Sequence, residues 1–175
     1  MLKLTPQQQQ NSVHIAPVRA NDATELIAAN CASRALHKGW VNPPVNIEDF
    51  AMWYDTQNND SNLTLIVRES TNNQIAGVFN FSQIVMKAFQ SAYLGYYGIA
   101  GFTGRGLMFE AINLVTVYGF NTIGLHRIEA NIQPANLSSI ALVKRSGFQK
   151  EGYSPRYLRV NGAWCDHERW ALLSD

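Results

Sequence analysis

A glycine-rich segment in the middle of the chain has the composition of an anion-binding loop. It reads GIAGFTGRG at 98–106 and lies between a run that predicts a strand and one that predicts a helix. Glycines let backbone amides converge on an anion, and the following helix N-terminus adds positive dipole. A dinucleotide fingerprint would need a third glycine at Phe109, and a P-loop would need Lys-Ser or Lys-Thr at Leu107 and Met108. The segment therefore predicts either a site for another phosphate-bearing ligand or a plain turn.

A second segment, NLSSIALVKRSGF at 136–148, predicts a short helix. Asn136 is a favoured N-cap residue, and Gly147 stands where a left-handed C-cap is expected. Between the two segments lie a long amphipathic helix and a strand at 127–132. With the strand expected at 92–97 they form a strand, helix, strand unit.

Hydrophobic periodicity predicts the elements that would position these segments. The strands from 63 to 97 are joined by hairpin-length turns and are therefore expected to be antiparallel. Asn161-Gly162 is the strongest short hairpin signal in the chain. Helices are expected after Asp22, from about Ile47, from Gly104 and from Asn136. Strands are expected at 13–19, 63–69, 75–84, 92–97, 127–132, 148–153, 157–160 and 164–172.

The length and composition predict one compact domain, and the order of the expected elements makes it mixed α/β. The chain has 175 residues, of which 46% are hydrophobic and 15% are charged. Its net charge is only +1, so no global field draws it to nucleic acid or to an anionic membrane. Any anionic ligand must be held by local geometry. Residues 1–11 are expected to be a flexible polar lead-in, and 12–175 a single domain.

Targeting and metal signals are missing from the sequence. The first residues have too short an apolar run for a secretory signal, and no run of about 18 apolar residues occurs, which predicts a cytoplasmic protein. Cys31 and Cys165 are far apart and no Cys/His cluster has ligand spacing, so no metal site is predicted.

The two segments resemble, in order and separation, the acetyl-CoA motifs of the GCN5-related N-acetyltransferase (GNAT) superfamily. The resemblance covers roughly residues 12–173 and is strongest to the RimJ/RimL-type ribosomal-protein N-terminal acetyltransferases. It rests on GRGLMFEA at 104–111, SGFQKEGY at 146–153 and YLRVNGAWCDH at 157–167. The implied α/β (α+β) fold is a mostly antiparallel sheet of about seven strands, flanked by about four helices and splayed after its fourth strand.

The resemblance implies which residues would hold acetyl-CoA. The superfamily's Gln/Arg-x-x-Gly-x-Gly/Ala loop falls on 103–108, where only Gly106 matches the consensus strictly. The loop would therefore depend on backbone amides and on Arg105 to neutralise phosphate. Asn136 matches a family asparagine, although a plain N-cap role explains it equally well. The implied cofactor-binding residues are Tyr96, Tyr97, Gly98, Thr103, Gly104, Arg105, Gly106, Leu107, Met108, Asn136 and Ser139.

The resemblance also implies groups that would handle the acetyl transfer. Tyr97 and Gly98 fall where a bulge in the family aims a backbone amide at the thioester carbonyl. Many members carry a tyrosine four residues before the Gly-Phe pair to protonate the CoA thiolate, but Val143 stands there. Ser139, one turn earlier, matches a serine of the RimJ/RimL type. Its hydroxyl either reaches the sulfur or bonds only to the local backbone.

A general base has no decisive motif, because Glu129, Tyr157, Asp166 and His167 are all candidates. A free α-amine has a pKa of about 7.7 to 8.0, against about 10.4 for lysine, and is therefore substantially neutral at cellular pH. A weak base or an ordered water could then suffice. The missing base favours an α-amine acceptor over lysine.

Three hypotheses for function follow. The favoured one is acetyl transfer to the N-terminal α-amine of a protein, which the resemblance implies to be a ribosomal protein of alanine/serine type. The second makes the acceptor a small amine such as a polyamine, an amino acid or an antibiotic, and acidic residues in the acceptor cleft would favour a polycation. The third is a non-catalytic acyl-CoA-binding module.

Acceptor and subunit contacts are expected from the remaining features. The aromatic residues Trp40, Trp53 and Tyr157 are expected to line the acceptor site, although packing under the helices would also explain them. The protein is predicted to be a monomer or a homodimer, with neither nucleic acid nor membrane as a partner.

Overall fold

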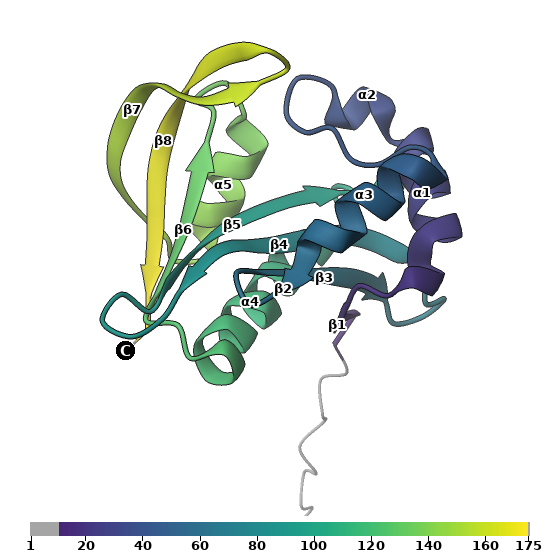
Figure 1. The fold of residues 1–175 in the computed structure, drawn as a ribbon, viewed down its shortest axis with the longest axis horizontal. Helices are drawn as coiled ribbons and strands as arrows, with labels where there is room; N and C mark the ends of the chain where they lie inside the picture. Colours follow the sequence, from purple (N-terminus) through teal and green to yellow (C-terminus); the bar gives the residue numbers. More distant parts are fainter. Residues whose placement is uncertain (1–10, 175) are drawn as a thin grey trace, which may run out of the picture.

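The computed structural model describes residues 11–174, apart from the side chain of Asn58 (Figure 1). The lead-in predicted at 1–11 lies almost entirely outside these residues. The helices are α1 (Ala23–Ala32), α2 (Arg34–His37), α3 (Ile47–Gln57), α4 (Leu107–Tyr118) and α5 (Leu137–Arg145). The strands are β1 (Val13–Pro17), β2 (Asn58–Asn59), β3 (Asn62–Glu69), β4 (Ile75–Val85), β5 (Ser91–Gly98), β6 (Arg127–Ile132), β7 (Gln149–Val160) and β8 (Ala163–Leu173). Within 11–174, no helix is both long and apolar enough to cross a membrane.

The sheet divides after its fourth strand. Its order is β1-β3-β4-β5-β6-β8-β7, with β2 paired at the side of β3, and the pairs are antiparallel except that of β5 with β6. This parallel pairing covers only 91–93 and 127–129, after which the two strands diverge (Figure 1). The predicted splayed, mostly antiparallel sheet is therefore confirmed.

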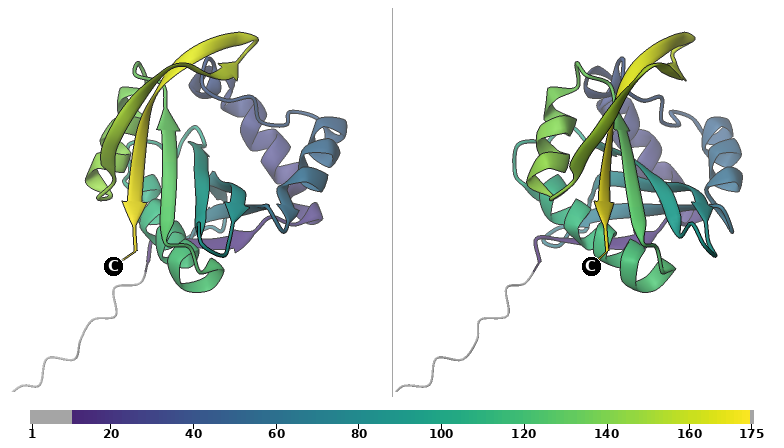
Figure 2. Two further views of the ribbon diagram at one scale, coloured as in Figure 1. Left: turned by 60° about the vertical axis from the view of Figure 1, so that its left-hand side comes forward. Right: turned by 90° about the vertical axis from the view of Figure 1, so that its left-hand side faces the viewer.

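Helices cover both faces of the sheet (Figure 2). One core lies under α4 and α5, and a second lies under α1 and α3. Because both faces are covered, β3 carries a continuous buried apolar run at 65–67 instead of alternating with polar residues. The side chains of β5 alternate between the cores: Leu94 and Tyr96 pack under α4 and α5, and Tyr97 packs under α1 and α3.

The helix predicted after Asp22 is divided in the structure. It forms α1 and α2, which meet at Ser33, where φ is −101° and ψ is 8°. The Ser33 hydroxyl donates a hydrogen bond to Ala29 O at 2.7 Å, a local bond that favours a bend in a helix. This division turns α2 towards the end of β5.

The two C-terminal strands predicted at 148–153 and 157–160 are one strand, β7. Its pairing with β8 is irregular over 154–158, where Arg156 adopts a φ of 49°. The Asn161-Gly162 hairpin is confirmed, with positive φ angles of 50° and 81° at its two turn residues.

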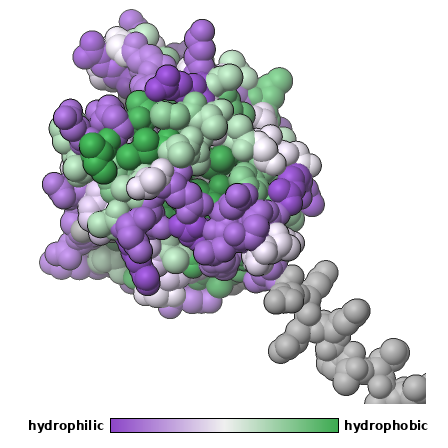
Figure 3. All heavy atoms as spheres, turned by 90° about the vertical axis from the view of Figure 1, so that its right-hand side faces the viewer, coloured by the Kyte–Doolittle hydropathy of each residue, from purple (hydrophilic) through white to green (hydrophobic). Residues whose placement is uncertain are grey.

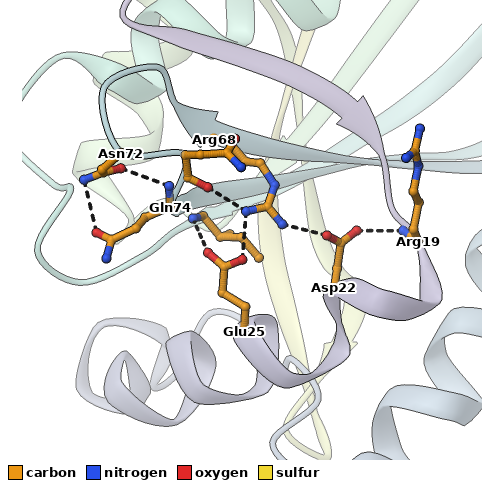
Figure 4. A network of polar contacts seen from close by, with 8 residues as sticks. Arg19, Asp22, Glu25, Arg68, Asn72 and Gln74 are labelled. Carbon is orange, nitrogen blue, oxygen red and sulfur yellow. Dashed lines mark hydrogen bonds and ion pairs between the residues drawn. The ribbon is translucent and has the colours of Figure 1, made fainter.

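Arg68 joins the first helix to the sheet (Figure 4). Its guanidinium donates to Asp22 at 2.6 Å and to Glu25 at 2.8 Å, and Glu25 also accepts from Ile75 N–H at 2.8 Å. Burial lowers the pKa of Arg68, but the hydrogen bonds and charges of the two carboxylates outweigh it and raise the pKa overall. The network fixes the start of α1 against β3 and β4.

Replacing Arg68 with leucine is expected to lower the free energy of unfolding by about 2 kcal/mol, because the two carboxylates lose their cation. In a chain of this size the melting temperature should fall by roughly 4–8 °C, measured by calorimetry. Arg68→Lys keeps the charge but not the forked geometry, and should lose less. A leucine variant as stable as the wild type would show that the network does not stabilise the fold.

Candidate active site

The backbone of β5 has a free edge beyond its short pairing with β6. Ile99 N–H donates to Ala76 O on β4 at 2.9 Å, and the register of β4 with β5 is regular over 77–82. Since backbone groups alternate in direction along a strand, those of Tyr96 and Gly98 point away from β4, towards the gap that β6 leaves. A ligand in that gap can bond to the backbone of Tyr96 and to the N–H of Gly98, as an added strand would, whereas Gly98 O is already bonded to His37.

Two sequence predictions about this strand are wrong. No bulge lies in β5 at 96–98, because the pairing of β4 with β5 is regular there. The pairing irregularities lie at Ala76, between β3 and β4, and after Ser82, between β4 and β5, and the free edge arises because β6 diverges. Tyr97 pairs with Val78 of β4, and its side chain is buried in the core under α1 and α3. Tyr97 therefore presents neither its backbone nor its side chain to the gap.

The loop after β5 leads into a helix N-terminus with unpaired amides. Gly101, Gly104 and Gly106 have φ angles of 88°, 75° and 80°, a left-handed conformation that favours glycine. Gly106 is the N-cap of α4, and no side chain caps the helix there. Thr103 and Gly104 are exposed beside it. The first amides of the helix are thus available to an anion, as a diphosphate group requires.

Arg105 is fixed by a partner that the sequence prediction missed. Its guanidinium forms an ion pair with Glu69 of β3 and lies 5.6 Å from the centre of the Phe102 ring. The Glu69 side chain is buried and also accepts from Asn72 Nδ2 at 2.7 Å. A guanidinium has five N–H donors, so Arg105 can keep this pairing and still donate to a phosphate.

Leu107 and Met108 contribute packing to the loop. Leu107 is buried, and Met108 packs against the core under α4. A Cβ atom built on Gly77 would lie 2.6 Å from Met108 Sδ, so the glycine in β4 gives the methionine its room. This explains how a large residue fits where the family loop has Gly or Ala, and it leaves only the backbone of these two residues to contact a ligand.

Ser139 and Tyr96 form a hydroxyl pair that joins α5 to β5. The two oxygens are 2.6 Å apart, and either can be the donor. Asn136 is confirmed as the N-cap of α5, since its side chain accepts from Ser139 N–H at 3.2 Å. Val143, at the position of the usual family acid, is fully buried in the core. The hydroxyl pair is therefore the polar group that α5 supplies on this side.

Burial raises the pKa of Tyr96 to about 12, although its hydrogen bond to Ser139 opposes the shift. An unfolded tyrosine has a pKa of about 10, so the unfolded state loses its proton first as the pH rises. The contribution of Tyr96 to stability is therefore complete below about pH 10 and falls as the pH approaches 12.

When the pH rises from 9 to 11, the free energy of unfolding of Tyr96→Phe is expected to fall less than that of the wild type, because the variant has no phenol to ionise at this position. Urea unfolding at each pH measures both values. Equal losses in the two proteins would contradict this role of the phenol.

A cleft of about 680 Å³ lies on the face of the sheet opposite α4 and α5, between α1, α2, α3 and the loop 38–46. Arg34 and Lys38 line it together with a single carboxylate, Asp49. Figure 3 shows this face, with a hydrophobic area in its upper half bordered by hydrophilic side chains. The cleft extends inwards to His37, next to the end of β5.

The structure does not bring the three predicted acceptor residues together. Trp53 lines the cleft and packs against Phe50, with the ring centres 5.6 Å apart. Trp40 is half-exposed in the loop 38–46 but does not line the cleft. Tyr157 is on β7, where its ring lies 6.1 Å from that of His167.

Polar contacts tie the loop 38–46 across the wide end of the gap between β5 and β6. Gln133 Nε2 donates to Gly39 O at 3.3 Å, and Asn42 Nδ2 donates to Asn161 Oδ1. The gap is thus bounded by strand pairing at one end and by exposed hydrogen bonds at the other.

None of the predicted bases lines the cleft. Glu129 forms an ion pair with Arg127 at 2.7 Å. His167 is buried on β8, with Nδ1 2.9 Å from a backbone carbonyl. Asp166 is on the exposed hairpin, where the hydrogen bond from Tyr153 OH is the main cause of its lowered pKa.

Sequence reasoning also missed two buried polar residues beside Gly98. His37 Nε2 lies 2.9 Å from Gly98 O, and Ser33 Oγ accepts from Ala100 N–H at 2.9 Å. No motif marks them, because they meet β5 only through the turn between α1 and α2.

Comparison with known proteins identifies the family. Residues 12–149 match the protein family described as "Acetyltransferase (GNAT) domain". The probable N-acetyltransferase YjcK of Bacillus subtilis is 37% identical over 105 residues, or 60% of this chain and 58% of its own. The ribosomal protein uS5-alanine N-acetyltransferase of Escherichia coli is 46% identical over 101 residues, or 58% of this chain and 52% of its own. The chain thus spans between half and three-fifths of these relatives.

Two solved structures show the same fold. RimJ of Mycobacterium smegmatis in complex with CoA-disulfide has a TM-score of 0.85 and 26% identity, with 93% of this chain and 82% of that chain covered. Spermidine N-acetyltransferase of Vibrio cholerae in complex with CoA and spermine has a TM-score of 0.79 and 19% identity, with 94% and 96% covered. The splayed sheet, the glycine loop and the family match together establish that this chain belongs to the GNAT acetyltransferase superfamily.

Proposed function

We propose that this protein is an N-acetyltransferase that transfers the acetyl group of acetyl-CoA to the N-terminal α-amine of a protein. The observation that carries the proposal is the free edge of β5 at Tyr96 and Gly98. It lies between the amides of α4, which suit a diphosphate, and the cleft beside α1 and α3. Acetyl-CoA supplies the acyl group as a thioester. A cytoplasmic location, where proteins are synthesised, is part of the proposal.

Gly98 is proposed to supply the main-chain donor for the reacting carbonyl. Its N–H faces the gap, and a backbone donor held by a sheet costs no reorganisation when negative charge develops on the carbonyl oxygen. Glycine has no side chain there, so the thioester can approach the strand closely.

Ser139 is proposed to donate a hydrogen bond to the departing sulfur, with Tyr96 supporting it. The pKa of Tyr96 is about 12, whereas that of a thiol is about 8.5, so the phenol stays protonated beside a thiolate. The pair therefore stabilises the charge by hydrogen bonding. The proton that finally reaches the sulfur comes from the acceptor nitrogen, which loses it as the amide forms.

The charge of the cleft favours a peptide over a polyamine. Arg34 and Lys38 line it against the single carboxylate Asp49, whose Oδ2 already accepts from Asn46 Nδ2 at 2.8 Å. A polycation would meet like charges there, while the carbonyl groups of a peptide would meet donors. The 46% identical relative is named as an N-acetyltransferase of the alanine of a ribosomal protein, which supports the same acceptor class.

A small amine is the second candidate, because a spermidine N-acetyltransferase shares the fold. An acceptor panel separates the two. CoA release would be measured with peptides that begin with Ala or Ser, with the same peptides blocked by N-terminal acetylation, and with spermidine. We expect turnover only with free N-termini, and a mass gain of one acetyl group on the first residue. Faster turnover of spermidine than of any peptide would refute the proposal.

A further inference from the structure

His37 holds the last carbonyl of β5 where the sheet has no strand to do so. Its Nε2 lies 2.9 Å from Gly98 O, and since a carbonyl oxygen only accepts, Nε2 carries the hydrogen. In a continuous sheet this carbonyl would accept from the next strand, but β6 has diverged by this point. The imidazole replaces the missing strand neighbour.

Three consecutive residues at this point are each held by a different partner. Gly98 O accepts from His37, Ile99 N–H donates to Ala76 O, and Ala100 N–H donates to Ser33 Oγ. The peptide group between Gly98 and Ile99 is therefore bonded at its oxygen to a helix and at its nitrogen to the sheet. Its plane is determined even though glycine itself gives the backbone little restraint.

The environment of His37 fixes the orientation of its ring. The residue is 4% exposed, and its ring meets that of Tyr97 edge-on at 5.0 Å. Nδ1 is buried without a hydrogen-bond partner among residues 11–174. A proton on Nδ1 would be a buried donor with no acceptor, which is costly, so the form with hydrogen on Nε2 is favoured.

His37 also lines the 680 Å³ cleft, so one side chain contacts both that cleft and the strand that would hold the thioester. We propose that His37 is a positioning residue for acetyl transfer. By holding the Gly98–Ile99 peptide it limits rotation about the Cα of Gly98, and this keeps the N–H of Gly98, in the preceding peptide, pointing at the reacting carbonyl. This inference rests on the proposed role of β5, but it does not depend on which amine is the acceptor.

The test compares three variants of His37, each assayed with the acceptor that the panel shows to be the best, whichever class of amine it is. His37→Gln places an amide N–H at nearly the reach of Nε2, His37→Asn reaches only as far as Nδ1, and His37→Leu has no donor. His126, which is exposed and far along the chain, supplies the control His126→Leu. The readouts are kcat, the two KM values, the Kd of CoA by calorimetry, and the pH profile of kcat/KM.

We expect kcat to fall about 10- to 100-fold in His37→Leu and His37→Asn, since a small misplacement of the donor costs that much. The Kd of CoA should change less than about threefold. His37→Gln should recover most of the rate with an unchanged pH profile, and His126→Leu should match the wild type. If the leucine variant does not fold, the comparison of Gln with Asn decides.

Equal rates in Gln and Asn would overturn the inference. So would loss of an ionisation from the pH profile of His37→Gln, because His37 would then act as a base. A wild-type protein that acetylates only small amines would refute the proposed acceptor, and the ranking of the three His37 variants would still test the positioning role.

Discussion

Replacing Ser139 with alanine is expected to lower kcat about 100-fold while leaving the Kd of CoA within about threefold of the wild type. The sulfur becomes negative only as the C–S bond breaks, so a hydroxyl aimed at it stabilises the transition state more than the bound substrate. Steady-state kinetics and calorimetric titration with CoA would measure the two effects.

Ser138 provides the matched control for this experiment. It lies on the same turn of α5, is exposed, and donates to Asn136 Oδ1 at 3.1 Å. Ser138→Ala should therefore keep the wild-type kcat. Tyr96→Phe keeps the ring but removes the bond to Ser139, and should lower kcat by about tenfold. An unimpaired Ser139→Ala enzyme would show that the hydroxyl bonds only within the fold.

The second large effect is expected from Gly106→Asp, which should raise the Kd of CoA at least about 100-fold. The aspartate would place a negative charge at the N-terminus of α4, where the diphosphate is proposed to bind, and like charges about 4 Å apart repel by roughly 4 kcal/mol near a protein surface. Calorimetric titration with CoA measures the change.

Gly162→Asp is the matched control, because it makes the same glycine-to-aspartate change far from the proposed diphosphate site. Gly162 also has a positive φ, of 81°, and no atom near its added Cβ, but it lies at the tip of the hairpin between β7 and β8. Both variants therefore bear similar backbone strain, and only Gly106→Asp should lose affinity for CoA. Similar affinities in the two variants would place the diphosphate elsewhere.

Periodicity predicted most of the elements because their apolar faces are set by local spacing. The strand predicted at 127–132 is β6, and the helix predicted from Ile47 is α3. The errors occur where a single backbone contact overrides the pattern. Ser33 bends one helix into two through its bond to Ala29, and an irregular pairing around Arg156 allows β7 to continue through a stretch without clear alternation.

The site was less predictable because it depends on strand parity and on distant partners. Tyr96 and Tyr97 are neighbours of identical type, and only the register with β4 shows which one faces α5. The partners of Arg105 and Gly98, which are Glu69 and His37, lie 36 and 61 residues away in the sequence. No short motif can encode a contact over such a separation.

The alternation of side chains along β5 has a consequence for protein engineering. Residues at 94 and 96 face the helices on the proposed donor side, whereas Tyr97 faces the core beside the acceptor cleft. Libraries of variants confined to the loop 38–46 would explore new amines without altering any residue of β5. A library at position 94 would explore other acyl groups while keeping Tyr96 and Gly98, so the two specificities could be evolved separately and then combined.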